Sequence, residues 1–270
     1  MSMSVTGFAK INLALHVRVR RPDGYHELET LFAFVDAGDR LSVRAAAQDS
    51  LQVTGEFAPA LTDPFGNIVM RALGALPHAG GLAVLLEKNL PVAAGLGGGS
   101  ADAGALFRAV RDMAGLPGDW PDRAARLGAD VPACVDSVTC IGRGTGTDLQ
   151  PLDSDLAGTP VLLVNPRIPL PTGPVFAGWD GRDRGPLPDG PASHIASEGR
   201  NDLEASAIAL CPPVADVLAT LRETGAWLVR MSGSGATCFA LYRTPQDRDG
   251  AAAQVAGQQP GWWQMAGALR

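Results

Sequence analysis

Hydrophobic and polar residues alternate along the start of the chain in the pattern of a β-strand. Every second residue from 11 to 19 is hydrophobic, in the order Ile11, Leu13, Leu15, Val17 and Val19, and the positions between them begin with Lys10, Asn12, Ala14 and His16. Such a period of two predicts a strand with two different faces. The sequence Pro22-Asp23-Gly24 predicts a turn after it. Residues 28–35 and 39–43 predict further strands, joined by a short connection at 36–39.

The hydrophobic period becomes that of helices after residue 67. Asn67 can cap a helix that begins behind it, and residues 82–88 then predict an apolar strand. Residues 101–114 carry hydrophobic side chains at helical spacing, and Gly115 is a typical helix end. A shorter helix is predicted over 121–127, with a bend at 128–132. This part of the chain therefore has the order strand, glycine-rich segment, helix.

The C-terminal part begins with a buried strand predicted at 161–164 and a loop at 165–173. Residues 178–199 are rich in glycine and proline and predict a long loop, a type that is usually functional or mobile. Helices are predicted over 201–210, 213–224 and 246–258, and strands over 227–231 and 237–242. The sequence shows no repeat of fixed period.

The size and composition are those of a globular protein. The chain has 270 residues, of which 46% are hydrophobic and 19% charged, and its mean hydropathy is +0.08. This length suits one large or two modest domains of about 100–200 residues each. A net charge of -6 and a pI near 5.2 argue against a nucleic-acid partner or a polybasic membrane surface. A small anionic substrate is compatible with this charge, because a local site can be positive.

The sequence also favours a cytoplasmic protein. It contains no apolar run of the ~20 residues that a membrane span needs, and the first residues lack the pattern of a signal peptide. The cysteines Cys134, Cys140, Cys211 and Cys238 form no C-x-x-C pair and have no histidine at zinc spacing. We therefore expect reduced, buried thiols and no structural metal.

A glycine-rich segment lies between the predicted strand at 82–88 and the helix at 101–114. It reads Pro91-Val92-Ala93-Ala94-Gly95-Leu96-Gly97-Gly98-Gly99-Ser100. Consecutive glycines let backbone N–H groups approach a polyanion, and the following helix N-terminus adds positive potential, so a phosphate is the expected guest. The segment is neither a Walker A loop nor a dinucleotide fingerprint. A tight turn used for packing is the alternative, and it would need fewer glycines.

Two charged residues are candidates for chemistry on that phosphate. Asp130 stands at a constrained bend, where a turn or cap residue and a catalytic base are about equally expected. Lys10 and Lys88 are the only lysines, beside twenty arginines. A lone lysine on a strand is ordinarily a solvated guard of a sheet edge. That alternative is weak for Lys10, because this chain uses arginine for solvated positive charge.

Two further clusters have both plain and functional interpretations. Residues 231–237 contain Ser232, Gly233, Ser234 and Gly235 between two predicted strands, and a hairpin turn is slightly favoured there. Tyr25 and His26 follow the predicted turn, with Phe32 close behind them. These rings could lie on a plain surface or stack on a nucleobase.

Taken together, these motifs resemble the 4-diphosphocytidyl-2-C-methyl-D-erythritol kinase family of the GHMP kinase superfamily. The matching blocks are Ala9–Leu13, Arg21–His26, Thr30–Phe32, Pro91–Ser100, Leu127–Pro132 and Ser232–Gly235. Their order and spacing match from about residue 7 to residue 242. The glycine loop alone indicates only a GHMP kinase, whereas the block ending in Tyr25 and His26 points to the specific family.

The resemblance implies an α+β fold of two GHMP kinase domains, at 1–152 and 153–270, with the active site in the cleft between them. The implied reaction is ATP-dependent phosphorylation of the 2-hydroxyl of the cytidine diphosphate-linked methylerythritol, in the non-mevalonate isoprenoid pathway. Mg²⁺ is implied as the companion of ATP, although no cluster of carboxylates announces a metal site. The implied partners are these small molecules, with no nucleic acid or membrane, and the oligomeric state stays open.

The resemblance also assigns residues to roles. It implies Lys10 and Asp130 as the catalytic pair. The residues implied for ATP are Asn67, Lys88, Pro91, Val92, Ala93, Ala94, Gly95, Leu96, Gly97, Gly98, Gly99, Ser100 and Ala101. Those implied for the substrate are Asn12, Tyr25, His26, Phe32, Thr172 and Phe176. Lys88 is also compatible with a plain charge at a strand end, so we expect a Lys→Arg change to be tolerated at 88 and to abolish turnover at 10.

Two departures from the family pattern are visible, because Ala93 stands where glycine is frequent and Ala101 where a second serine is frequent. Two other readings stay open. One is a GHMP kinase for a small alcohol without a nucleotide, such as a homoserine or mevalonate kinase, which CMP would not inhibit. The other is a nucleotide-binding regulator without turnover, against which the presence of both Lys10 and Asp130 argues.

Overall fold

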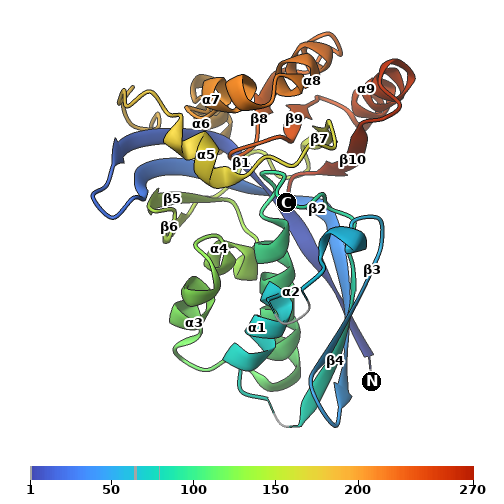
Figure 1. Ribbon diagram of the computed structural model, residues 1–270. Helices are drawn as coiled ribbons and strands as arrows, with labels where there is room; N and C mark the ends of the chain where they lie inside the picture. The colour runs from blue at the N-terminus through green and yellow to red at the C-terminus, as the bar shows by residue number, and fades with distance from the viewer. Residues whose placement is uncertain (1, 64–65, 79) are drawn as a thin grey trace. The chain divides into compact units, whose positions relative to one another are not determined.

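The computed structural model describes residues 2–63, 66–78 and 80–270, which form two compact units (Figure 1). Unit 1 comprises residues 1–10, 37–92 and 97–137, and unit 2 comprises residues 11–36, 93–96 and 138–270. The chain passes between them several times, so the two units do not coincide with a single division at residue 152. The long strands β1 (Ser2–Arg20) and β2 (His26–Ala46) each contribute residues to both.

Unit 1 places helices on one face of its strands (Figure 1). Besides its parts of β1 and β2, it contains β3 (Ser50–Thr54), the 3₁₀ helix η1 (Ala58–Ala60), α1 (Ile68–Ala75), β4 (Gly81–Glu87), α2 (Gly98–Ala114), α3 (Trp120–Leu127) and α4 (Val131–Asp136). Strand β4 pairs with β2 antiparallel and with β3 parallel. Helix α2 is central, since Leu106, Phe107 and Val110 are buried against the strands and the other helices. Burial of each such side chain stabilises the unit by about 1.5–3 kcal/mol.

Unit 2 contains two groups of strands and the C-terminal helices. Its elements are β5 (Cys140–Gly144), β6 (Asp148–Pro151), β7 (Pro160–Asn165), α5 (Thr172–Ala177), α6 (Ala192–Glu198), α7 (Glu204–Leu210), α8 (Pro213–Arg222), β8 (Leu228–Met231), β9 (Cys238–Leu241), α9 (Pro245–Gln258) and β10 (Trp263–Ala268). Strands β5 and β6 extend the first half of β2, and a separate sheet has the order β10-β7-β9-β8.

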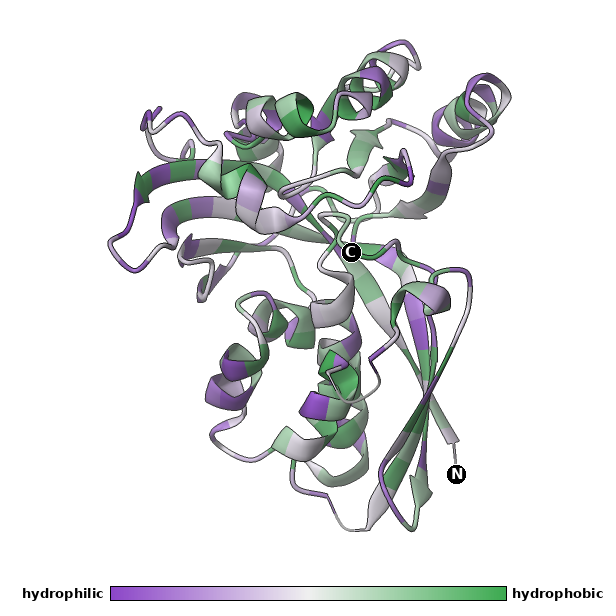
Figure 2. Ribbon diagram, viewed as in Figure 1, coloured by the Kyte–Doolittle hydropathy of each residue, from purple (hydrophilic) through white to green (hydrophobic). Residues whose placement is uncertain are grey.

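Hydropathy separates the core of unit 2 from its surface. Val217, Leu218 and Leu221 of α8 belong to the same buried cluster as Leu162 of β7 and Tyr242, which follows β9. Figure 2 shows β9 as hydrophobic and the turn between β1 and β2 as hydrophilic. That turn, at residues 21–25, is where the sequence predicted it. The alternation in β1 is less simple, because its polar residues are buried as well, including Lys10, Asn12 and His16.

Most predicted elements are confirmed, with small shifts of their ends. The sequence located six helices and four later strands correctly. The helices are the one after Asn67 and those at 98–114, 120–127, 204–210, 213–222 and 245–258, and the strands are those at 81–87, 160–165, 228–231 and 238–241. The sequence did not indicate β3, α4, β5, β6, α5 or β10. The long loop predicted at 178–199 is wrong in its last part, because residues 192–198 form α6.

The short connection expected at 36–39 was also wrong, since β2 continues through these residues. The reason is Gly38, which serves close backbone packing and not a turn. A Cβ on Gly38 would lie 2.0 Å from the carbonyl oxygen of Gly7 in β1. Glycine inside a strand is typical of such a close approach between backbones.

This packing predicts the effect of a single methyl group. Gly38→Ala should lower the free energy of unfolding by more than about 2 kcal/mol, because the clash is with backbone that cannot rotate away. Gly74→Ala in α1 is the matched control, since a Cβ there meets no atom of the described residues within 4 Å. Alanine should stabilise that helix by about 0.5–1 kcal/mol. Urea unfolding measures both, and a stable Gly38→Ala protein would contradict the explanation of β2.

Candidate active site

Lys10 and Asp130, the predicted catalytic pair, lie together in unit 1. Lys10 stands on β1, and its Nζ is 3.0 Å from Oδ2 of Asp130. Asp130 precedes α4, yet within the described chain its side chain makes no capping hydrogen bond to that helix. The carboxylate is 33% exposed, whereas the Lys10 side chain is only 5% exposed. The pair is therefore a carboxylate open to a small molecule and held by a buried ammonium group.

The glycine loop begins α2 directly beside this pair. Gly97 has φ +60°, and a Cβ on it would lie 3.0 Å from Cε of Lys10 and 3.7 Å from Oδ2 of Asp130. Glycine is required here both by the left-handed backbone and by the lack of space. Helix α2 then starts at Gly98, so its first-turn N–H groups, which an α-helix leaves without internal partners, adjoin the pair. This is the geometry of an anion site at a helix N-terminus.

The first half of the loop, residues 93–96, belongs to unit 2 and is held by the hairpin between β8 and β9. The carbonyl of Ala94 accepts a hydrogen bond from the Thr237 N–H at 3.1 Å, and that of Gly95 accepts one from Ser232 Oγ at 2.7 Å. The hairpin reading of residues 231–237 is confirmed, and its serine also supports the loop. Ala93 has φ +53°, a left-handed value that glycine adopts more readily than alanine.

Residues predicted to read a nucleobase gather in unit 2. The ring centroids of His26 and Phe176 are 5.1 Å apart, and Trp179 meets His26 edge-on at 5.8 Å. Arg20 donates from Nε to Nε2 of His26 at 3.3 Å and from its terminal nitrogen to the carbonyl of Ala177 at 3.0 Å. Because Nε2 accepts this bond, the proton of the neutral ring is on Nδ1. Burial, followed by the charge of Arg20, lowers the pKa of His26 and favours this neutral form.

The other predicted substrate residues are placed differently. Tyr25 is 65% exposed at the turn after β1, whereas Phe32 is buried and faces Gly142 of β5. Asn12 donates to Thr30 Oγ1 at 2.7 Å, and Thr172 Oγ1 lies 3.0 Å from Ser234 Oγ. Residue Asn12 is two positions from Lys10 on β1, so both side chains start from the same face of the strand.

Comparison with known proteins shows similarity over the whole chain. The family models described as GHMP kinases N terminal domain and GHMP kinases C terminal match residues 67–144 and 190–260. A protein of Novosphingobium aromaticivorans named 4-diphosphocytidyl-2-C-methyl-D-erythritol kinase is 68% identical over 270 residues, which cover 100% of this chain and 94% of that protein. A protein of the same name from Erythrobacter litoralis is 63% identical and covers 98% of each chain. The chain belongs to the 4-diphosphocytidyl-2-C-methyl-D-erythritol kinase family.

Solved structures agree with this membership. A crystal structure of 4-(cytidine 5'-diphospho)-2C-methyl-D-erythritol kinase superposes with a TM-score of 0.82 at 34% identity and covers 99% of both chains. A homoserine kinase from Cytophaga hutchinsonii, at 17% identity and a TM-score of 0.71, covers 99% of this chain and 95% of its own and shows likeness of fold alone. The predicted family and α+β kinase fold are confirmed, and the chain is an enzyme of the kinase type.

Two residues predicted at the nucleotide have structural contacts in this kinase. Asn67 caps α1, since its side-chain oxygen accepts the Val69 N–H at 2.9 Å. Lys88 is 2% exposed and paired with the carboxylates of Asp39 and Asp102. A Cβ on Gly98 would lie 3.0 Å from its Nζ. This enclosure disfavours the wider guanidinium group and so argues against the expectation that arginine is tolerated at 88.

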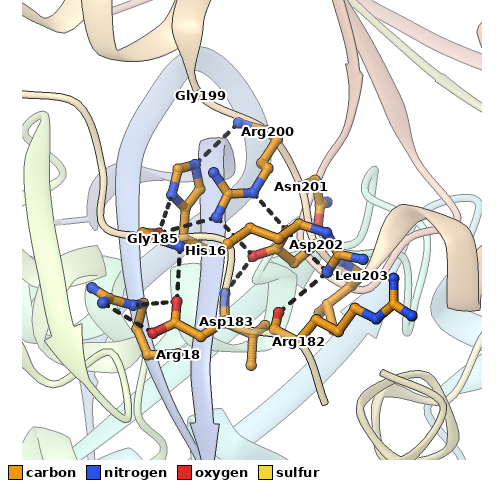
Figure 3. A network of polar contacts seen from close by, with 12 residues as sticks. His16, Arg18, Arg182, Asp183, Gly185, Gly199, Arg200, Asn201, Asp202 and Leu203 are labelled. Carbon is orange, nitrogen blue, oxygen red and sulfur yellow. Dashed lines mark hydrogen bonds and ion pairs between the residues drawn. The ribbon is translucent and has the colours of Figure 1, made fainter. Parts of the chain in front are cut away.

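Residues 178–199, the segment that the sequence predicted as a long loop, are held to β1 by a polar network (Figure 3). The Nδ1 atom of His16 lies 3.1 Å from the carbonyl of Gly185 and 3.0 Å from that of Pro186, and its Nε2 accepts the Arg200 N–H at 3.2 Å. Arg18 binds the Asp183 carboxylate through two nitrogens at 2.8 and 3.1 Å. The sequence left this segment as either functional or mobile, and the polar network argues against a mobile segment.

Sequence reasoning missed several residues of the candidate site. Arg20 stands directly before the recognised Arg21–His26 block, so its neighbourhood was a usable signal. Trp179 lies in a segment that was interpreted as loop, and its burial beside His26 depends on tertiary packing alone. The contact between Ser232 and the glycine loop joins residues far apart in the chain. No pattern in the local sequence predicts it.

Over residues 2–63, 66–78 and 80–270, no group of three or more His, Cys, Asp or Glu side chains is arranged to hold a metal ion. The same described part contains no helix that is both long and apolar enough to span a bilayer.

His16 predicts how the stability of this kinase depends on pH. Burial, and then the charge of Arg200, lower the pKa of His16 below its usual value of about 6.5. Below about pH 6.5 the unfolded chain binds a proton at His16 that the folded protein does not bind. The free energy of unfolding therefore decreases as the pH is lowered through this range. His16→Asn should flatten this slope by up to about 1.4 kcal/mol per pH unit. Urea unfolding between pH 7 and 5 measures it, with the exposed His194→Asn as control. An unchanged slope in His16→Asn would contradict the assignment.

Proposed function

We propose that this kinase transfers the γ-phosphoryl group of ATP to the 2-hydroxyl of 4-diphosphocytidyl-2-C-methyl-D-erythritol, in the non-mevalonate route to isoprenoid precursors. The observation that carries the transfer step is the contact of Lys10 and Asp130 beside the first turn of α2. The substrate is supported by relatives of that name at 68% and 63% identity over essentially the whole chain.

The transfer needs an acceptor for one proton and stabilisation of charge. The exposed carboxylate of Asp130 accepts the hydrogen bond of the substrate hydroxyl and takes its proton. The oxygen then forms a bond to the γ-phosphorus, while the bond from that phosphorus to the ADP oxygen breaks. Lys10 holds the carboxylate at 3.0 Å and supplies positive charge to the phosphoryl group in transit.

ATP phosphates are placed against the loop Pro91–Ala101. The N–H groups at the start of α2 give oriented positive dipoles there without the flexibility of a long side chain. Mg²⁺ is supplied with ATP and neutralises phosphate charge when bound. Mg²⁺ in such sites usually keeps several waters and would be held chiefly by the phosphate oxygens of ATP.

The cytidine group is placed beside His26 and Phe176. A Nδ1–H donor on His26 suits an acceptor on the edge of cytosine, and the flat ring of Phe176 suits stacking. The substrate also contacts the other residues that the resemblance implies for it, which are Asn12, Tyr25, Phe32 and Thr172. Within this assignment, Arg20 acts through His26 by fixing its tautomer.

Domain division and location are further parts of the proposal. A boundary near residue 152 would separate the matched N- and C-terminal family regions at 67–144 and 190–260. A cytoplasmic location is supported by the four cysteines, which are all buried thiols without disulfides in the described chain.

The catalytic pair is tested by conservative substitutions. Lys10→Arg should lower kcat by at least about 100-fold, because the guanidinium group has a different shape and Gly97 leaves no space for it. Asp130→Asn should lower kcat by about 100- to 10,000-fold through loss of the base. Coupled ADP release with the cytidine diphosphate substrate measures both. Arg44→Lys, on the exposed part of β2, is the matched control for a change between cations. Near-normal kcat in either variant would contradict the assignment of the catalytic pair. Turnover of homoserine or mevalonate that CMP does not inhibit would instead contradict the proposed substrate.

The role of Arg20 gives a separate prediction. Arg20→Met removes the donor that keeps the proton of His26 on Nδ1, so the KM for the cytidine substrate should rise about 10-fold while kcat and the KM for ATP change little. Steady-state kinetics with each substrate varied in turn measure this split, with Arg44→Met as control. A loss confined to kcat would assign Arg20 to the transfer step instead.

A further inference from the structure

Lys88 joins two acidic side chains in a fully buried cluster of unit 1. Lys88 follows β4, Asp39 lies in β2 and Asp102 in the second turn of α2. Their exposed fractions are 2%, 0% and 2%. The ammonium group donates to Oδ2 of both carboxyl groups, at 2.8 Å for Asp102. One positive charge therefore faces two acidic groups that water does not reach.

If both carboxyl groups were ionised, the cluster would have a net charge of -1. An uncompensated negative charge in the interior is strongly unfavourable. The second oxygen of Asp102, Oδ1, faces Gly7 of β1 and finds no hydrogen-bond partner in the described part of the chain. The Oδ2 atoms of Asp39 and Asp102 contact the same ammonium group, so the two carboxyl groups converge on one cation. A proton on one of them removes the uncompensated charge.

The surroundings favour a proton on Asp102. Burial raises its pKa well above the usual value; Lys88 opposes this, and the charge of Asp39 and the hydrogen bond to it add to it. The other charged groups nearby are committed elsewhere. Lys10 and Asp130 pair with each other beside Gly97. Arg108 of α2 donates to the backbone carbonyls of Cys134 and Val135.

The cluster also holds both ends of the glycine loop. Oδ1 of Asp39 accepts the N–H groups of Asn89 and Leu90 at 2.6 and 2.8 Å, which fixes the chain as it enters the loop. At the exit, Gly98 lies against Nζ of Lys88, where a Cβ would be 3.0 Å away. Asp102 ties the same ammonium group to the helix that Gly98 begins.

We infer that Lys88, Asp39 and Asp102 form a buried clamp for the phosphate loop that shares one proton between its two carboxyl groups at neutral pH, and that Asp102 is a positioning residue for ATP. This inference rests on the proposed ATP site. While the proton is present, the cluster is neutral and the N-terminus of α2 attracts phosphate. Loss of the proton at alkaline pH places a negative charge under that N-terminus and weakens ATP binding.

The shared proton is tested without any activity measurement. In the full-length protein labelled with ¹³C at the aspartate carboxyl carbons, one resonance should titrate with a midpoint above pH 7 and be missing in Asp102→Asn. Infrared spectra of the wild type should show a carboxylic-acid carbonyl band at pH 7 that disappears at alkaline pH, so the test does not depend on the variant folding. Titration of every aspartate near the ordinary value of about 4, with no such band, would overturn the shared proton.

The positioning role is tested by the pH profile of nucleotide binding. The dissociation constant of a non-hydrolysable ATP analogue should rise about 5-fold in the wild type as pH increases through that midpoint. In Asp102→Asn, which cannot ionise at this position, the constant should show no such rise with pH. The control Asp153→Asn, exposed between β6 and β7, should follow the wild type. A rise that persists in Asp102→Asn would overturn the role of Asp102. A wild type that binds no analogue would contradict the proposed ATP site and leave the titration result standing.

Discussion

The first turn of α2 depends on the packing of two adjacent glycines against the only two lysines of the chain. A Cβ on Gly97 would lie 3.0 Å from Cε of Lys10, and a Cβ on Gly98 would lie 3.0 Å from Nζ of Lys88. Each lysine is buried and paired with acidic side chains. A guanidinium group is wider than an ammonium group, so neither position suits arginine. The preference of this chain for arginine elsewhere therefore has its exception where backbone, cation and carboxylate share very little space.

The remainder of the loop depends on unit 2 through its own set of contacts. Ser232 binds the carbonyl of Gly95, and its oxygen also accepts the Asn12 N–H at 3.2 Å. The hairpin that carries Ser232 is in turn fixed by Asn201, whose amide donates to the carbonyls of Met231 and Gly233, each at 2.8 Å. A loop rich in glycine gains little rigidity from its own side chains. Its rigidity comes instead from neighbours that satisfy its carbonyl groups.

The sequence predicted what depends on local pattern and on recognisable motifs. Hydrophobic period and capping residues located α1, α2 and α8, and the motif blocks led to the correct family. The continuous course of β2 through Gly38 was not predicted, because a glycine that admits a neighbouring backbone has the same letter as one that turns the chain. The burial of Lys88 was missed for a related reason, since its partners Asp39 and Asp102 lie 49 and 14 residues away. Long-range charge pairing leaves no period in the sequence.

The two lysine sites differ in the one property that separates chemistry from support. The carboxylate beside Lys10 is one-third exposed, so it can exchange a hydrogen bond with a small molecule. The carboxyl groups beside Lys88 are closed to water and share their cation. A group that accepts a proton in each catalytic cycle must reach the substrate, whereas a group that fixes a loop gains from a low dielectric, where its bonds are strong. The difference in burial of their carboxyl partners therefore separates the proposed catalytic lysine from the supporting one, although a Cβ on the adjacent Gly97 or Gly98 would lie 3.0 Å from each lysine side chain.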